Sequence, residues 1–144
     1  MSGERVVVEQ SEMAFRHSAG KLGTQFLTAL RSGRILGWRT GNPARVLVPP
    51  KDVGLPGEWV EIGPRAKLIA YAPREWLRSS DRANENSCLA LVMLDGADTA
   101  MLSRVDFNDA TGALAPNTSL QARFCSEPRG AMTDFWFEPV VEVA

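Results

Sequence analysis

The chain has 144 residues, of which 44% are hydrophobic and 23% are charged, and its formal net charge is −1. This length and composition are typical of one soluble globular domain with a sizeable core, and the balanced charge implies no general attraction to nucleic acid or to an anionic membrane. No apolar stretch reaches the ~18 residues of a transmembrane helix, and the polar N-terminus lacks a signal-peptide core, so we expect a cytoplasmic protein without a membrane partner.

A helix is the first predicted element and lies within residues 1–38. Leu22, Phe26, Leu27 and Leu30 recur at helical spacing on one face. Thr24 is a plausible N-terminal cap, so we expect the helix to begin near it. A glycine at position 33 is placed to end the helix in a left-handed turn.

Residues 39–57 have the composition of a loop around one short apolar run. They contain four of the nine prolines, at positions 43, 49, 50 and 56, together with three glycines. The run from Val46 to Val48 predicts a small hairpin, with an edge strand that Pro49 stops.

Residues 58–140 predict a succession of strands. The expected strands are Trp59 to Ile62, Lys67 to Tyr71, Cys88 to Leu94, Ala100 to Val105, Leu120 to Phe124 and Phe135 to Phe137. The continuous apolar run from Cys88 to Leu94 is typical of a strand that is buried on both sides, and Asp95-Gly96 after it is a hairpin signal. Short strands with such turns favour a small barrel or sandwich.

A long polar connection, Pro73 to Asn86, lies between two of these strands. Arg74, Arg78 and Arg82 are spaced by four and would form one basic stripe on a helix, suited to phosphate groups. Trp76 is the best candidate among the tryptophans for a contact with a ligand or partner. The simpler interpretation of the stripe is a solvated charged face.

The segment from Arg39 to Gly57 resembles a zinc ribbon of the form R-C-x-x-C-G-x-x-x-x-P-P-R-x-x-C-x-x-C. The leading arginine, both prolines, the basic residue after them and an aromatic strand start are present. All four metal-ligand positions are changed, to Thr40, Pro43, Gly54 and Gly57. Because a four-cysteine zinc site needs thiolate ligands, we expect no metal here.

Further matching residues extend this resemblance over most of the chain. They are Phe26, Leu30, Gly33, Ile35, Gly37 and Arg39; Pro49, Pro50 and Lys51; Trp59, Val60 and Glu61; Ala90 to Gly96; and Phe137 with Pro139. Their order is similar to that of small acyl-CoA-associated OB-fold proteins with an N-terminal rubredoxin-like zinc ribbon, the family called domain of unknown function thirty-five. The resemblance implies a mainly β protein with three parts: a tail and helix (1–38), a degenerate zinc-ribbon hairpin without metal (39–57) and a small Greek-key OB-fold barrel (58–140).

The same resemblance implies a non-catalytic accessory protein that binds a thiolase-fold enzyme and helps to hold acyl-CoA. CoA or acyl-CoA would then be a ligand, its phosphates would contact Arg74, Arg78, Arg82 and Trp76, and no other cofactor is expected. The sequence leaves open whether the chain forms a homo-oligomer. The alternative that a barrel alone would suggest is a nucleic-acid-binding OB-fold module, which the net charge of −1 disfavours.

Catalysis is the least favoured interpretation, with a stand-alone thioesterase as its most concrete form. Cys88 and His17 are a conceivable nucleophile and base, but nothing in the sequence brings them together. Cys88 opens a strand that is predicted to be buried, and buried thiols are usually inert. With Cys125 it is best explained as a free thiol in a reducing compartment.

Overall fold

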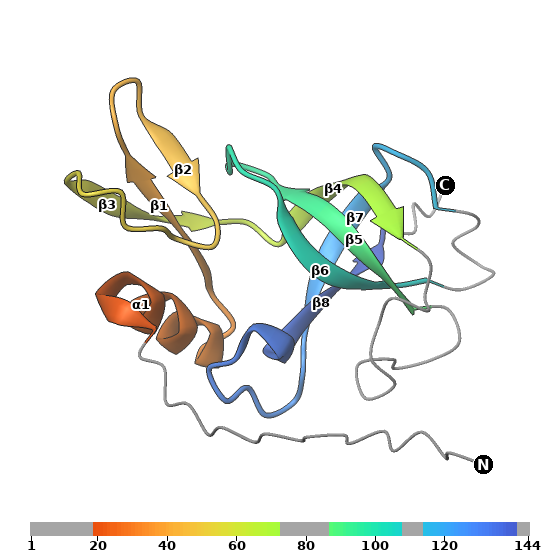
Figure 1. The fold of residues 1–144 in the computed structure, drawn as a ribbon. Coiled ribbons are helices and arrows are strands. Elements are labelled where there is room, and N and C mark those ends of the chain that lie inside the picture. Colours follow the sequence, from red (N-terminus) through yellow and green to blue (C-terminus); the bar gives the residue numbers. More distant parts are fainter. Residues whose placement is uncertain (1–18, 73–86, 108–113, 141–144) are drawn as a thin grey trace, which may run out of the picture.

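The structure is a computed structural model that describes residues 19–72, 87–107 and 114–140. In chain order its elements are α1 (Gly20–Arg31), β1 (Ile35–Thr40), β2 (Arg45–Leu47), β3 (Gly57–Ile62), β4 (Arg65–Ala72), β5 (Ser87–Leu94), β6 (Met101–Asp106), β7 (Ser119–Phe124), the 3-10 turn η3 (Met132–Asp134) and β8 (Phe135–Pro139). Figure 1 shows a three-stranded sheet with α1 beside it, next to a barrel that contains β4 to β8. The prediction of a mainly β protein with one N-terminal helix and a small barrel is confirmed.

The helix begins four residues earlier than predicted, at Gly20 instead of near Thr24. Ala19 occupies the N-cap and makes no side-chain capping bond, while the backbone oxygen of Thr24 accepts a hydrogen bond of 2.7 Å from the Thr28 hydroxyl. The prediction that Thr24 caps the helix is therefore wrong. Gly23 costs the helix roughly 1 kcal/mol relative to alanine, a penalty that tertiary burial of the following turns outweighs.

The buried face of α1 and its C-terminal end agree with the sequence. Phe26, Ala29 and Leu30 are buried. Gly33 has a φ of +69°, and the N–H groups of Gly33 and Arg34 donate to the carbonyls of Leu30 and Ala29. This left-handed glycine ends the helix as predicted and turns the chain directly into β1.

The three-stranded sheet has the order β2-β1-β3, and both pairings are antiparallel. β2 is an edge strand that ends at Leu47, close to Pro49, as the proline predicted. The strand containing Trp59, which was expected to open the barrel, instead pairs along its whole length with β1. Alternating apolar residues define a strand but not the sheet that it joins, and the break at Gly63-Pro64 separates this strand from β4.

The free edge of β2 is covered by the turn between β5 and β6. Asp98 accepts a hydrogen bond from the Val46 N–H through its carboxylate (2.8 Å) and donates its own N–H to the Val46 carbonyl (2.9 Å). The Thr99 hydroxyl accepts a further bond from the Val48 N–H at 2.9 Å. These contacts satisfy an edge that would otherwise be open to pairing with another chain, and they fasten the sheet to the barrel.

The closed barrel has the strand order β4-β5-β6-β8-β7. All of its pairings are antiparallel except that of β6 with β8, where Val105 lies opposite Phe137. This arrangement is consistent with a small OB-fold-like barrel. Gly96, with a φ of +93°, makes the predicted turn between β5 and β6.

One apolar cluster links α1, the three-stranded sheet and the barrel. The helix, the sheet and the residue after β2 contribute Phe26, Leu30, Ile35, Val46, Val48 and Ile62. The barrel strands and the segment before β7 contribute Ala66, Leu68, Cys88, Ala90, Val92, Leu94, Met101, Val105, Leu114, Leu120, Ala122, Phe135 and Phe137. The sheet and the barrel thus share a core. No helix in the described part of the chain is long and apolar enough to cross a membrane.

Candidate functional site

Two of the four positions that match metal ligands of a zinc ribbon pair with each other across the sheet. Thr40 of β1 and Gly57 of β3 are register partners. The Thr40 side chain is buried, and its hydroxyl donates a hydrogen bond of 2.9 Å to the Pro56 carbonyl. This bond joins the end of β1 to the loop that enters β3, the same two segments that a metal ion would bridge.

The Trp38 ring lies against the backbone of Gly57. A Cβ atom placed on Gly57 would come within 2.6 Å of this ring and 2.5 Å of the Arg39 carbonyl oxygen. Trp38 also meets Trp59 edge to face, with ring centroids 5.0 Å apart. An aromatic ring therefore fills the space beside a position where the zinc-ribbon pattern has a cysteine side chain.

The other two positions build turns. Gly54 has a φ of +77°, and its N–H donates a hydrogen bond of 2.9 Å to the Asp52 carboxylate. Pro43 has no side-chain donor atom. Since Thr40 already uses its hydroxyl, these four residues do not fit a zinc ion, and the described residues contain no group of three histidine, cysteine or acidic side chains that could hold one.

The outer face of the barrel carries an apolar groove over β4, β5 and β6, with a volume of about 290 Å³. The groove is lined by Ala70, Tyr71, Ala72, Leu89, Ala90, Leu91 and Leu102. Ala70, Leu91 and Leu102 lie opposite one another on the three strands. Tyr71 is 51% exposed, Leu91 37% and Leu102 62%. Large apolar side chains that gather on one exposed face typically mark a binding surface.

An irregularity in β4 helps to create this groove. The pairing of β4 with β5 shifts register between Leu68 and Ala70, so that Ile69, Ala70 and Tyr71 are all exposed in succession. A bulge of this kind re-aims the side chains that follow it. The prediction that β5 is buried on both sides is wrong for the same region, because Leu91 faces the groove.

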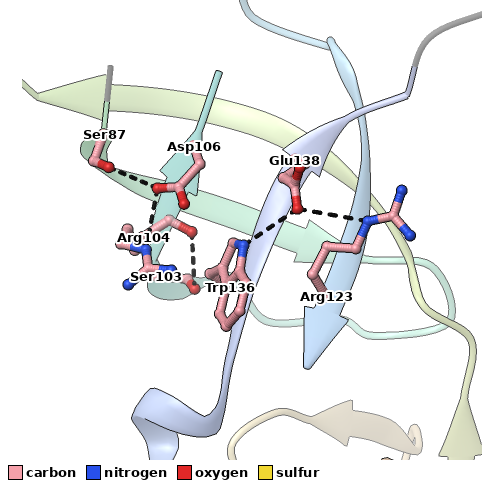
Figure 2. A network of polar contacts seen from close by, with 7 residues as sticks. All are labelled: Ser87, Ser103, Arg104, Asp106, Arg123, Trp136 and Glu138. Carbon is pink, nitrogen blue, oxygen red and sulfur yellow. Dashed lines mark hydrogen bonds and ion pairs between the residues drawn. The ribbon is translucent and has the colours of Figure 1, made fainter. Parts of the chain in front are cut away.

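A chain of polar contacts crosses the strands beside the groove (Figure 2). Asp106 accepts a hydrogen bond of 2.7 Å from the Ser87 hydroxyl and forms an ion pair of 3.1 Å with Arg104. The Arg104 guanidinium also lies 4.5 Å from the centre of the Trp136 ring. Arg104 pairs in register with Leu89, a groove residue, so this polar chain borders the apolar groove directly.

The chain continues to β7 through Glu138. This carboxylate accepts a hydrogen bond of 3.3 Å from the Trp136 indole N–H and forms an ion pair of 3.5 Å with Arg123. Figure 2 shows the two arginines and the two carboxylates alternating along the face. Because the charges balance, the network suits the role of holding strands together better than that of binding a charged ligand.

The thiol of Cys88 lies inside the barrel. Burial, together with the nearby charge of Asp106, raises its pKa to about 11. A thiol with so high a pKa is almost entirely protonated at neutral pH and is a poor nucleophile.

A second hollow, of about 340 Å³, lies where the three-stranded sheet meets the barrel. Its lining residues include Ile35, Ile62 and Phe124, together with Arg34 and Glu61. The last two form an exposed ion pair of 3.1 Å. These opposite charges satisfy each other, so the hollow offers no unbalanced charge to a ligand.

No protein-family model and no curated protein matches the chain. A solved structure does match it, the crystal structure of a protein with unknown function from the DUF35 family of Sulfolobus solfataricus. The chain shares its fold with that DUF35 protein. The TM-score is 0.59, the sequence identity is 17%, and the match covers 84% of this chain and 87% of the other. Because the DUF35 structure is itself described as having unknown function, the likeness brings no activity with it.

The predicted ligand residues fall outside the described part of the chain. Arg74, Trp76, Arg78 and Arg82 belong to residues 73–86, so their grouping stays a prediction. The segment does connect Ala72, which lines the apolar groove, to the first residue of β5. The groove was not predicted from the sequence, because Leu89, Ala90 and Leu91 belong to the run that the sequence predicts to be buried on both sides.

Proposed function

We propose that this chain is a non-catalytic accessory protein that docks on a thiolase-fold enzyme and helps to hold acyl-CoA. The observation that carries the proposal is the exposed apolar groove over β4, β5 and β6. The resemblance of the sequence to acyl-CoA-associated OB-fold proteins names the partner, and the fold shared with a DUF35 structure is compatible with it.

The groove has the chemistry of a docking surface. Tyr71, Leu91 and Leu102 are at least one third exposed, and covering such side chains fully contributes about 1.5–3 kcal/mol for each large aliphatic residue. Tyrosine is also enriched at the centres of protein interfaces. A partner that covered this face would remove Tyr71, Leu91 and Leu102 from water.

The described residues support a role without catalysis. The Ser87 hydroxyl donates a hydrogen bond to the Asp106 carboxylate, which already forms an ion pair with Arg104. The described residues contain no histidine that could act as its base. Cys88 is buried with a raised pKa. Neither residue has the arrangement of an activated nucleophile with its base and an orienting group.

A nucleic-acid-binding module is the alternative, and this surface disfavours it. Binding of single strands requires a positively charged groove with aromatic platforms for the bases. The groove contains Tyr71 but no cationic residue, and Arg104 beside it is paired with Asp106. We expect weak or no binding of single-stranded DNA or RNA at physiological salt, which fluorescence anisotropy measures, and submicromolar binding with a steep salt dependence would reverse the ranking.

The first experiment is a docking test with a purified thiolase-fold enzyme from the same cell. Leu102→Glu should abolish a complex that the parent protein forms in size-exclusion chromatography, because it places a charge in the buried centre of the interface. Leu55→Glu is the matched control, since Leu55 is 53% exposed but lies in the loop before β3. Equal complex formation by the parent, Leu102→Glu and Leu55→Glu proteins would contradict docking through the groove.

The acyl-CoA part of the proposal needs its own measurement. A triple change of Arg74, Arg78 and Arg82 to alanine should weaken CoA binding by the complex in calorimetry. Each lost charge-assisted phosphate contact costs on the order of 1.5–3 kcal/mol. If the triple variant binds both CoA and the enzyme as the parent does, these arginines are a solvated face and not a phosphate site.

A further inference from the structure

A recess with a different chemistry lies between α1 and the loop that joins β7 to η3. Its volume is about 240 Å³. It is lined by Ala19, Thr24, Leu27, Thr28 and Arg31 from the helix side and by Arg129 and Gly130 from the loop. Two arginines and two hydroxyl-bearing residues thus surround one hollow, and no acidic residue lines it.

The loop wall of the recess is fixed by Asp134. One oxygen of its carboxylate, Oδ2, accepts hydrogen bonds from the backbone N–H groups of Arg129 (3.0 Å), Gly130 (2.7 Å) and Ala131 (2.9 Å). Burial would raise the pKa of this carboxyl, but the three N–H donors and the charge of Arg129 outweigh burial and lower it. Asp134 therefore stays ionised and holds the loop backbone in one conformation.

The helix wall is fitted closely to that loop. Gly130 has a φ of +87°, and a Cβ atom built on it would lie 3.2 Å from both Cγ and Cδ of Arg31. The aliphatic stem of Arg31 thus lies against the loop backbone, and Arg31 and Arg129 are both exposed residues that line the recess. The left-handed backbone conformation favours glycine at position 130.

The charge of the recess is positive. Among the described residues, no carboxylate oxygen lies within 4 Å of a guanidinium nitrogen of Arg31 or Arg129 as an ion pair. Asp134 is near Arg129, but its accepting oxygen is occupied by three backbone donors. The two arginines therefore carry more positive charge than the single nearby carboxylate of Asp134 can balance.

We propose that this recess binds a phosphate group, held by the guanidinium groups of Arg31 and Arg129. Guanidinium groups match phosphate oxygens with paired donors and stay charged at all physiological pH values. The volume of about 240 Å³ is below the ~300–1,000 Å³ of pockets that enclose a whole drug-sized ligand. The recess therefore suits the phosphate end of a larger molecule, or a small polyphosphate, and leaves the rest of the molecule outside.

This inference goes beyond the proposed function and does not depend on it. It uses residues that are separate from the apolar groove and from the arginines at positions 74, 78 and 82. The phosphate could belong to CoA or to a free phosphate compound such as a nucleotide, and the two sources are separated by the probes used below.

The test is titration of the full-length protein with pyrophosphate, ADP and CoA, followed by amide NMR shifts and calorimetry. We expect shifts at Thr28, Arg129 and Gly130 with all three probes if the site recognises phosphate in general, and much tighter binding of CoA if the cofactor is the source. Either pattern supports the site. Absence of shifts at these amides with millimolar amounts of every probe would overturn it.

The variants Arg31→Gln and Arg129→Gln remove the charges, and the first retains most of the stem that lies on Gly130. Each should weaken phosphate binding about tenfold or more, as expected for loss of one charge-assisted contact. Arg45→Gln is the matched control, because Arg45 is an exposed arginine on β2 outside the recess. Equal affinities for all three variants and the parent would refute the assignment, whereas loss of enzyme docking by Leu102→Glu with unchanged phosphate binding would leave it intact.

Discussion

Replacing Gly57 with alanine should destabilise the protein although it adds only one methyl group. The added Cβ would lie 2.5 Å from the Arg39 carbonyl oxygen and 2.6 Å from the Trp38 ring. The carbonyl belongs to the paired strand β1, so it cannot move without disturbing the ladder between β1 and β3. The Trp38 ring cannot move without separating from Trp59.

The size of the effect follows from these contacts. Forcing a methyl group into filled space typically costs about 1–3 kcal/mol, and loss of an aromatic pair adds about 0.5–1.5 kcal/mol. Replacement of glycine by alanine restricts the unfolded chain and returns about 0.4–1 kcal/mol. We therefore expect the free energy of unfolding to fall by about 0.5–4 kcal/mol. Each kcal/mol lowers the melting temperature by roughly 3 °C in a chain of this length.

The assay is urea denaturation followed by tryptophan fluorescence, with Gly63→Ala as the matched control. A Cβ atom on Gly63 meets nothing within 4 Å, so this variant should be neutral or slightly stabilised. Trp38→Leu in the Gly57→Ala background should recover part of the loss, and a double-mutant cycle measures that coupling. If Gly57→Ala is as stable as Gly63→Ala, the Trp38 ring does not pack against Gly57 as described.

Four further predictions follow from individual contacts. The purified, untagged protein should contain no stoichiometric zinc by elemental analysis, and zinc whose removal by a chelator unfolds the chain would contradict this. Thr40→Val should lower the free energy of unfolding by about 0.5–1.5 kcal/mol, because it removes the hydrogen bond to Pro56; a stability equal to that of the parent would show that the bond contributes nothing. Asp134→Asn should lower the free energy of unfolding by about 1–2 kcal/mol at neutral pH and make stability less sensitive to acid. The folded-state pKa of Asp134 is lowered, so the stabilisation by its carboxylate is complete above the unfolded-state pKa of about 3.9. That stabilisation is lost as the pH falls through the folded-state pKa. In the native protein Cys88, with a pKa of about 11, should resist alkylation at pH 8 while the partly exposed Cys125 reacts, and equal rates measured by mass spectrometry would show that Cys88 is accessible.

Much of the fold could be predicted because the local signals agree with the tertiary structure. Gly33 ends the helix, Pro49 follows an edge strand, and Gly96 turns β5 into β6, each through a backbone preference that sequence alone reveals. The start of the helix was placed wrongly because Gly23 lowers helix propensity locally, whereas burial of Phe26 and Leu30 decides the outcome.

The candidate sites were harder to predict for three physical reasons. The run from Cys88 to Leu94 is apolar throughout, and hydrophobicity alone cannot separate a core residue from one that faces an open groove. The register shift at Leu68 that exposes Tyr71 leaves no distinct sequence signal. The recess joins Arg31 to Arg129, which are far apart in the chain and meet only through the tertiary fold.

The three-stranded sheet is held in place by contacts that need no metal ion. A bound zinc ion contributes folding energy directly, so a chain without it needs other contacts between the same segments. Here the Thr40 hydroxyl bridges to Pro56 at one end of the sheet, and Asp98 joins β2 to the barrel at its edge.

These contacts have a consequence that a metal site does not. A zinc ion stabilises a ribbon from within, whereas the Asp98 bonds and the shared core make the three-stranded sheet depend on the barrel. Separate movement of the two parts would break those bonds and expose the common core. The sheet is therefore best understood as a fixed support for α1, which keeps Arg31 beside Arg129 at the recess, on residues separate from those that line the apolar groove of the barrel.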